Sequence, residues 1–315
     1  MEFDPTDLVG LQAAARHINR CDIVIIQHEF GIFGESDGVS ILDLLESIDR
    51  PIIAVLHTVL PSPTRRQAAI IEAIAARATP IVLCESARDV LEANYAVAPG
   101  TAVVIPHGAN WSAQPPNHQP RRELISWGLL GPGKGLERAI DAMGLLRGID
   151  PPVRYRIVGR THPAVVSRSG TGYRQSLEAL VARRGLEDVV EFVDRYVDDT
   201  ELFDMVRHAD LVVVPYDNDD QVSSGVITEA LGMGRPVVAT RFPYAVELLG
   251  GGAGMVVNHD SDDLASAIRT LLEDPITYRR AARAAGEESK RLGWGPVARS
   301  YSRLIHELSP ALATA

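Results

Sequence analysis

The feature that most restricts the fold of this chain is the alternation of short apolar runs with amphipathic stretches. Four such runs lie before residue 110 and six more lie after residue 122. Runs of about four to eight apolar residues are typical of strands buried in a parallel sheet, and stretches with helical spacing between them cover such a sheet. The runs begin at Cys21, Pro51, Pro80, Thr101, Glu123, Val153, Val189, Leu211, Pro236 and Gly254. The alternation predicts an α/β protein.

The length of 315 residues favours two domains, and a polar, proline-rich segment at 111–122, WSAQPPNHQPRR, has the composition of a linker. We therefore expect two Rossmann-like, doubly wound parallel-sheet domains at 1–110 and 111–292, followed by a helix at 293–315 that packs back toward the first domain. The first series lacks the opening strand, glycine-rich turn and helix of a complete fold of this kind. We expect a truncated first domain and an in-frame upstream segment that encodes the missing unit.

Charge and composition exclude several classes of protein. A formal charge of −10 opposes a sequence-independent grip on nucleic acid, which needs clustered Lys and Arg. Cys21 and Cys84 lie in apolar runs without metal-ligand spacing, so we expect buried free thiols. The amino terminus has no signal-peptide pattern and no apolar run is long enough to span a membrane, which predicts a cytoplasmic protein. Arg65 and Arg66 follow a proline-rich turn, where peripheral membrane contact and a solvated helix start both remain open.

A glycine-rich segment, Gly128–Gly135, joins a predicted strand to a helix, so backbone N–H groups and a helix start meet where an anion can bind. Lys134 adds a mobile positive charge. The letters of Gly128, Gly133 and Lys134 match the nucleotide-binding pattern G-x-x-x-x-G-K, but Gly135 stands where that pattern requires a magnesium-binding Ser or Thr. A P-loop-like NTPase is therefore the weaker hypothesis, and a glycine-rich turn with a surface lysine is the structural alternative.

A second segment, QVSSGVITE at 221–229, follows the apolar run from Leu211 and leads into a helix. Ser223, Ser224 and Gly225 can offer backbone N–H groups to a phosphate, while Glu229 can accept hydrogen bonds from ribose hydroxyls. Taken alone, the segment is only a capped helix.

The ordered set of motifs resembles the family 4 retaining glycosyltransferases, which have the GT-B fold. The resemblance covers nearly the whole chain. It comprises QHEFGIFG from Gln27, LHTVLP from Leu56, IPHG from Ile105, GLLGPGKG from Gly128, RIVGRTHP from Arg156, ADLVVVPY from Ala209, QVSSGVITEALGMGRPVVAT from Gln221 and the helix from Trp294. No single piece is specific, but eight in sequence are.

The resemblance implies an acceptor domain at 1–110 and a nucleotide-sugar donor domain at 111–292. Lys134 would bind the donor diphosphate, Glu229 the ribose, and Ser223 to Gly225 the distal phosphate or sugar. Two positions depart from the family. Gly131 stands where an arginine is common, and Gln221 stands where a glutamate is common, so this side chain cannot place a negative charge beside a developing oxocarbenium ion.

On the acceptor side, His57 follows a buried strand and matches the family histidine that faces the donor sugar. A strand-end histidine bonded to backbone is the competing interpretation. His28 and Glu29 are further candidates for sugar or acceptor contacts. On the donor side, we expect Gly131 and Gly133 to line the phosphate loop, and Arg160 and His162 to touch base or phosphate; a surface ion pair is the alternative for Arg160. His107 and Gly108 are expected at the hinge.

By this resemblance the chain is a retaining hexosyltransferase that moves a sugar, mannose or glucose, from a nucleoside-diphosphate sugar to a hydroxyl acceptor, with His57, Lys134, Gln221 and Glu229 as the catalytic set. No cofactor or metal is expected, because Asp217, Asp219 and Asp220 are interpreted as a solvated acidic loop. A nucleotide-sugar-binding pseudo-enzyme without turnover is the alternative from another class. The sequence identifies neither the acceptor nor the oligomeric state.

Overall fold

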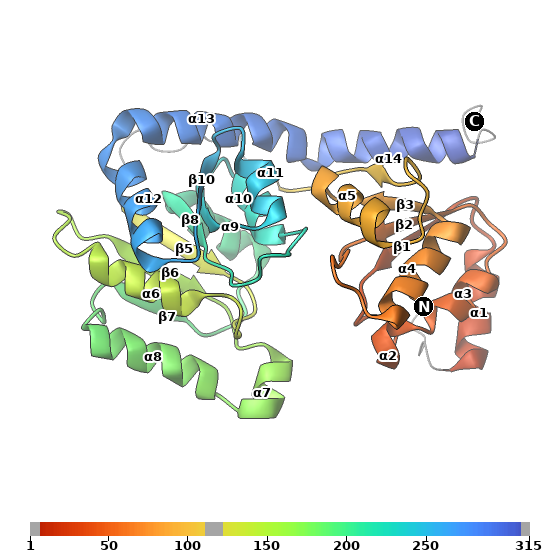
Figure 1. Cartoon of the computed structure of the whole chain (residues 1–315), viewed down its shortest axis with the longest axis horizontal. Helices are drawn as coiled ribbons and strands as arrows, with labels where there is room; N and C mark the ends of the chain where they lie inside the picture. The colour runs from red at the N-terminus through yellow and green to blue at the C-terminus, as the bar shows by residue number, and fades with distance from the viewer. Residues whose placement is uncertain (1–6, 111–121, 310–315) are drawn as a thin grey trace. The chain divides into compact units, whose positions relative to one another are not determined.

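The chain forms two compact units, shown in Figure 1 as a computed structural model that describes residues 7–110 and 122–309. The first unit comprises Met1–His107, Asp220–Ser223 and Val297–Ala315, and the second comprises Gly108–Asp219 and Ser224–Pro296. Within the described residues, each of the ten predicted apolar runs overlaps one strand. The predicted α/β fold with two parallel sheets is confirmed, whereas nearly all of the predicted linker, residues 111–121, lies outside the described residues.

The first unit holds a four-stranded parallel sheet in the order β1-β2-β3-β4, which follows the chain. Its strands are β1 (Val24–His28), β2 (Ile52–Leu56), β3 (Thr79–Val82) and β4 (Val103–Val104). Its helices are α1 (Leu8–Ile18), α2 (Glu35–Gly38), α3 (Ile41–Glu46), α4 (Arg65–Arg77), α5 (Glu85–Asn94) and most of α14 (Trp294–Leu308). Every residue of β2 is buried, but β1 alternates, with Ile25 and Gln27 exposed.

Local sequence accounts for where these helices begin. Thr64 and Gln67 form a capping box at the start of α4, because the Thr64 hydroxyl accepts from the Gln67 amide and the Gln67 side chain accepts from the Thr64 amide. Arg65 and Arg66 form the first turn of α4, and Arg66 donates to Asp37. Cys84 caps α5 and is buried, as expected, whereas Cys21 lies in a bend before β1 and is exposed. The prediction of two buried thiols is therefore wrong for Cys21, because its apolar run becomes a strand only at Val24.

The second unit is a complete doubly wound sheet in the order β10-β9-β8-β5-β6-β7, with every pair parallel. Its strands are β5 (Glu123–Trp127), β6 (Arg154–Val158), β7 (Val190–Val193), β8 (Leu211–Val214), β9 (Val237–Thr240) and β10 (Gly254–Val257). Its helices are α6 (Leu136–Leu145), α7 (Pro163–Ser169), α8 (Gly172–Arg184), α9 (Asp199–His208), α10 (Gly225–Gly232), α11 (Pro243–Leu249), α12 (Ser261–Glu273) and α13 (Pro275–Leu292). The order reverses between β5 and β8, and such switch points are where open α/β sheets bind ligands, beyond the carboxyl ends of the strands.

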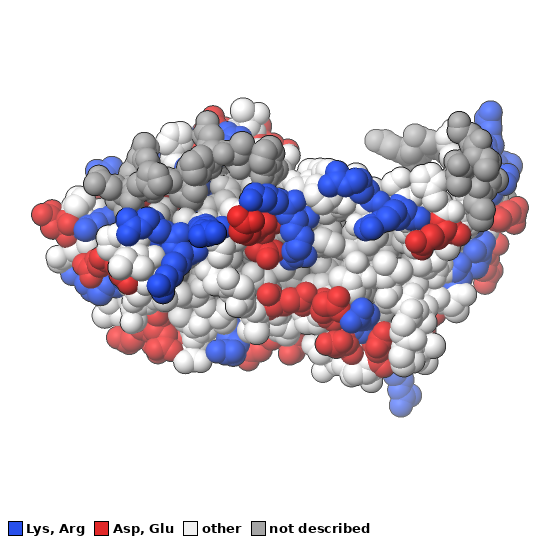
Figure 2. Space-filling model, turned by 90° about the horizontal axis from the view of Figure 1, so that it is seen from above, with Lys and Arg blue, Asp and Glu red and all other residues white. Residues whose placement is uncertain are grey.

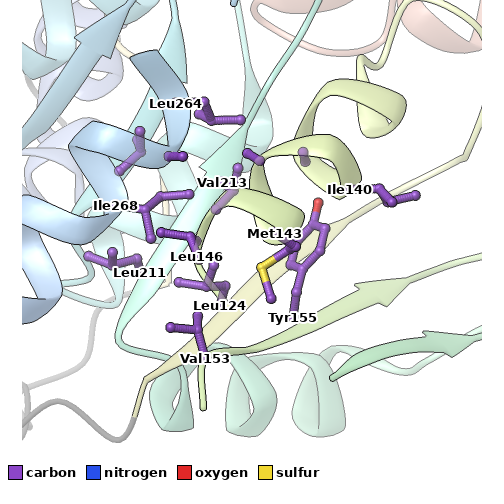
Figure 3. Packing of buried hydrophobic residues seen from close by; sticks show 14 of the residues in the cluster. Leu124, Ile140, Met143, Leu146, Val153, Tyr155, Leu211, Val213, Leu264 and Ile268 are labelled. Atoms are coloured by element: carbon purple, nitrogen blue, oxygen red, sulfur yellow. The ribbon is translucent and has the colours of Figure 1, made fainter. Parts of the chain in front are cut away.

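The core of the second unit joins helices α6, α8 and α12 to one face of the sheet. Figure 3 shows side chains of α6 and α12, such as Met143 and Ile268, gathered around Tyr155 of β6 and Val213 of β8. Alternate residues of β8, Val212 and Val214, are equally buried but point the other way. Both faces are thus covered, which explains why the strands read as unbroken apolar runs.

The charged surface shows no wide basic area on the face drawn in Figure 2, where Lys and Arg side chains alternate with Asp and Glu and with uncharged surface. Among the helices of residues 7–110 and 122–309, none has the length and apolar character needed to cross a bilayer.

Candidate functional site

At the switch point of the second sheet, the glycine-rich loop after β5 lies on the segment that follows β8. Gly135 has φ +62°, and a Cβ atom there would stand 1.7 Å from the carbonyl oxygen of Pro215. The Asp217 amide donates to the Gly133 carbonyl at 3.0 Å. Glycine is therefore required at position 135 for the two segments to approach, and a Ser or Thr of the NTPase pattern would not fit this backbone.

Lys134 is half-buried at this crossing. Its Nζ atom lies 4.2 Å from the ring centroid of Tyr216, over the ring face. Burial lowers the pKa of the Lys134 ammonium, because desolvation disfavours the charged form. The ammonium thus lies against an electron-rich ring and is partly shielded from water. Because the shielding weakens solvent screening, the ammonium would attract a phosphate strongly.

Arg138 of α6, which the sequence did not indicate, also holds the glycine-rich loop against the segment after β8. Its guanidinium pairs with Asp217 at 2.8 Å and donates to the Pro215 carbonyl at 2.8 Å. Asp219 lies 3.1 Å from the His259 imidazole, and Asp220 is exposed. In the predicted solvated loop, Asp217 thus has a cationic partner and Asp219 an imidazole partner. Within the described residues, no group of three or more His, Cys, Asp or Glu side chains is placed to hold a metal ion.

The segment after β6 runs beside the glycine-rich loop. The Leu130 amide donates to the Arg160 carbonyl at 2.9 Å, and the His162 amide donates to the Leu130 carbonyl at 2.8 Å. A Cβ atom at Gly131 would lie 3.3 Å from Val165 of α7 and 3.9 Å from His162. The side chains of Arg160 and His162 are exposed. A Cβ atom at position 131 would therefore require Val165 to give way by a few tenths of an ångström.

Helix α10 begins opposite this loop. Ser224 is its N-cap, and the Ser224 hydroxyl accepts from the Ile227 amide at 3.3 Å. The first amides of a helix have no partner within it, so those of Gly225 and Val226 are suited to an anion. Glu229 lies in the second turn of α10. Its side chain is half-buried, and its Oε2 atom accepts a hydrogen bond from the Asn110 amide at 3.1 Å. Burial raises the pKa of the Glu229 carboxyl.

In the first unit, the candidate side chains gather at the carboxyl ends of β1 and β2. His57 Nε2 lies 2.7 Å from Gln27 Oε1, and its ring centroid lies 6.2 Å from that of His107. Burial and, after it, the neighbouring His107 lower the pKa of His57, so its neutral form is favoured. The Thr58 hydroxyl donates to Glu29 Oε2 at 2.6 Å.

His28 is the one acceptor-side candidate without exposed surface. Its ring packs edge-on against Phe30 and stacked on Phe33, with centroid distances of 5.2 and 6.3 Å. Burial lowers the pKa of His28 to about 4. Because His28 has no exposed surface, a ligand cannot contact this ring unless the residues that cover it move.

The predicted run Ser223–Gly225 is divided between the units, because Asp220–Ser223 belongs to the first. The Ser223 hydroxyl donates to the His57 carbonyl at 2.9 Å, and Gln221 Nε2 donates to the Ser223 carbonyl at 2.6 Å. The Cys84 thiol donates to the Val222 carbonyl at 3.1 Å. These bonds hold the segment at strand ends of the first unit, and the Gln221 amide nitrogen donates within its own loop.

The structure therefore assembles two sets of candidates. The second unit contains Gly131, Gly133, Lys134, Arg160, His162, Ser224, Gly225 and Glu229, and the first contains His28, Glu29, His57, Gln221 and Ser223. Tyr216 and Arg138 were missed, although the polar aromatic at the end of the run LVVVPY was a usable signal, since strand ends at a switch point face the ligand.

The chain is similar in sequence to known glycosyltransferases. The family described as "Glycosyl transferases group 1" matches residues 121–274. D-inositol 3-phosphate glycosyltransferase 2 of Catenulispora acidiphila is 35% identical over 195 residues, which are 59% of this chain and 44% of that protein. D-inositol 3-phosphate glycosyltransferase of Kineococcus radiotolerans is 28% identical over 94% of this chain and 75% of its own length. The first of these alignments thus spans less than half of the relative.

Solved structures share the fold at low identity. Sucrose-phosphate synthase from Thermosynechococcus elongatus superposes with a TM-score of 0.74 and 21% identity, over 95% of this chain and 76% of that one. Anabaena Alr3699/HepE, in complex with UDP and glucose, gives a TM-score of 0.76 and 20% identity, over 95% of this chain and 81% of that one. The resemblance seen in the sequence is confirmed: residues 121–274 form a group 1 glycosyltransferase domain, and the chain has the GT-B fold.

Proposed function

We propose that the chain transfers a sugar from a nucleoside-diphosphate sugar to a hydroxyl acceptor with retention of the anomeric configuration. The observation that carries the proposal is that Tyr216, at the switch point of the second sheet, contacts both the Lys134 ammonium and the side chain of Ser224, which caps α10. Both features suit a diphosphate, and α/β sheets bind ligands at this place. Retention is supported by the family resemblance.

In the proposed reaction, the bond between the anomeric carbon and the distal phosphate oxygen breaks, and the electron pair leaves with the nucleoside diphosphate. The acceptor oxygen forms the new bond to the anomeric carbon, and its proton passes to the departing diphosphate. The leaving group gains negative charge as it departs, so Lys134 and the first amides of α10 stabilise the transition state more than the ground state. We propose that these groups suffice without a metal ion.

Glu229 has a distinct role in this proposal. Its carboxylate is held near the start of the second unit's chain by the Asn110 amide and accepts hydrogen bonds from the ribose hydroxyls. Arg160 and His162, exposed beside the glycine-rich loop, contact the base or phosphate. On the acceptor side, a neutral His57 is available to accept a hydrogen bond from a sugar or acceptor hydroxyl, with Glu29 as a second contact.

A thermal-shift panel of UDP-, GDP- and ADP-sugars tests the donor, because a ligand that binds the native state raises the melting temperature. UDP-glucose and GDP-mannose are the first donors to try. Inositol 3-phosphate is the first acceptor to try, since the curated relatives are named for it. Product analysis then separates transfer with retention from binding without turnover, and EDTA should leave transfer unchanged.

The chain offers a matched control for the phosphate contact, because Lys134 and Lys290 are its two lysines. Lys290 is exposed and pairs with Glu287. By calorimetry, Lys134→Ala should weaken binding of the nucleotide sugar by more than about 1.5 kcal/mol, since a charge-assisted hydrogen bond is lost. Lys290→Ala should leave the affinity unchanged. Equal affinities of the two variants would remove Lys134 from the site.

A further inference from the structure

Tyr216 contacts both halves of the proposed diphosphate site. Its ring face lies 4.2 Å from the Lys134 Nζ atom, and its hydroxyl is hydrogen-bonded to the Ser224 side chain. Only 6% of the residue is exposed. One buried side chain therefore touches the ammonium group on one loop and the N-cap of α10 on the other.

The ring is itself held firmly. It stacks on Phe242 with a centroid distance of 5.7 Å and an interplanar angle of 15°. The Tyr216 carbonyl accepts from the Thr240 hydroxyl at 2.6 Å, at the end of β9. Because Phe242 and the Thr240 hydroxyl hold Tyr216 in place, its ring and hydroxyl can in turn restrict the groups they contact, Lys134 and Ser224.

We propose that Tyr216 is a positioning residue, which holds the Lys134 ammonium and the start of α10 where both can bind one diphosphate. This inference rests on the proposed function. A free lysine side chain samples many rotamers, and binding a phosphate would require it to give up that freedom. The ring restricts the ammonium before the ligand arrives, and the hydroxyl keeps Ser224 at its capping position. Tyr216 needs no contact with the ligand to do this.

Two substitutions separate the contributions of the ring and the hydroxyl. Tyr216→Phe keeps the ring face under Lys134 and removes the bond to Ser224. Tyr216→Leu removes both. Tyr278→Phe is the control, because Tyr278 is also buried in the same unit and its hydroxyl has no hydrogen-bond partner within the described residues.

The test is calorimetric titration of the wild type and the variants with UDP and GDP and with the matching monophosphates, UMP and GMP. We expect Tyr216→Leu to weaken binding of the preferred diphosphate about tenfold or more, and Tyr216→Phe about threefold, since a cation–π contact and a hydrogen bond are lost in turn. Binding of the monophosphate should change less than about twofold, because the distal phosphate is the one that Lys134 would meet. Tyr278→Phe should match the wild type.

A general loss of structure would weaken both nucleotides alike, and that result overturns the inference. In the Lys134→Ala background, Tyr216→Leu should cost much less than it does alone, since its effect passes through the lysine. Equal costs in both backgrounds also overturn it. If Tyr216→Leu does not fold, a double-mutant cycle replaces it, in which Tyr216→Phe, Ser224→Ala and the double variant are compared. Non-additive effects of the two substitutions on diphosphate affinity support the inference, and additive effects overturn it. Failure of the wild type to bind any nucleoside diphosphate, or an unchanged affinity of Lys134→Ala, would instead refute the proposed function.

Discussion

The burial of His28 predicts how the stability of the protein depends on pH. Its ring is fully buried, neither ring nitrogen has a hydrogen-bond partner within the described residues, and burial lowers its pKa from 6.5 to about 4. Between these values the unfolded chain binds a proton that the folded chain does not. The contribution of His28 to stability is therefore complete above pH 6.5 and is lost as the pH falls toward 4.

Urea titrations at pH 7.5 and 4.5 measure this loss. His28→Leu should lessen the fall in the free energy of unfolding between the two pH values by on the order of 2–3 kcal/mol, because the variant has no proton to gain at this position. His17→Leu, at an exposed position of α1, should keep the wild-type dependence on pH. A wild-type slope in His28→Leu would show that His28 does not titrate as its burial requires.

Some site residues were visible in the sequence and others were not. Lys134 and Ser224 lie at turns from strand to helix, and the local pattern of glycine, serine and helix spacing is enough to mark such turns. Arg138 and Tyr216 each make a contact with a residue far away in the sequence: Arg138 bonds to Pro215 over 77 positions, and the ring of Tyr216 lies against Lys134. No local pattern encodes such a contact. It arises only once β5 and β8 lie side by side.

At the scale of elements, the glycine-rich loop depends on a close approach of backbone at Gly135. At Gly135, φ is +62° and an added Cβ would meet the Pro215 carbonyl at 1.7 Å, so Gly135→Ala must displace the loop from the segment after β8. We expect a loss of about 2–4 kcal/mol in stability and at least tenfold weaker nucleotide binding, since strain and steric overlap add.

Gly144→Ala in α6 is the control, because nothing lies within 4 Å of an added Cβ there. It should leave nucleotide affinity unchanged and stabilise the chain by up to about 1 kcal/mol, as alanine favours a helix. Thermal denaturation and calorimetry compare the two variants. Wild-type binding by Gly135→Ala would mean that the crossing of the two loops is not needed for the site.

The strands were predictable as elements because both faces of each sheet are covered, which leaves long apolar runs with clear ends. The order of the second sheet also follows from a general rule, since doubly wound sheets reverse at one point. The assignment of Asp220–Ser223 to the first unit does not follow from any such rule. It depends on bonds to His57 and Cys84, residues more than 130 positions away.

At the scale of the whole molecule, the two units exchange short segments of chain. The chain passes from one unit to the other after His107, Asp219, Ser223 and Pro296. Helix α13 contributes Tyr278, Ala281 and Ala282 to the core of the second unit, whereas α14, beyond Pro296, contributes to the core of the first. The stability of the first unit therefore depends on residues at the opposite end of the sequence.

Leu304 tests this dependence. It is 7% exposed, and it packs with Val297 in the cluster that includes Ile53 and Val55 of β2 and Ile81 of β3. Leu304→Ala should destabilise the first unit by about 2–4 kcal/mol, because the substitution removes buried apolar contacts and leaves a cavity. Hydrogen exchange followed by mass spectrometry should then show faster exchange in β2 and β3 and unchanged exchange in β5 and β8. Arg303→Ala, at the exposed neighbouring position, should change neither. Faster exchange in both sheets would mean that the units unfold together, and no change in β2 and β3 would mean that α14 is dispensable for the first core.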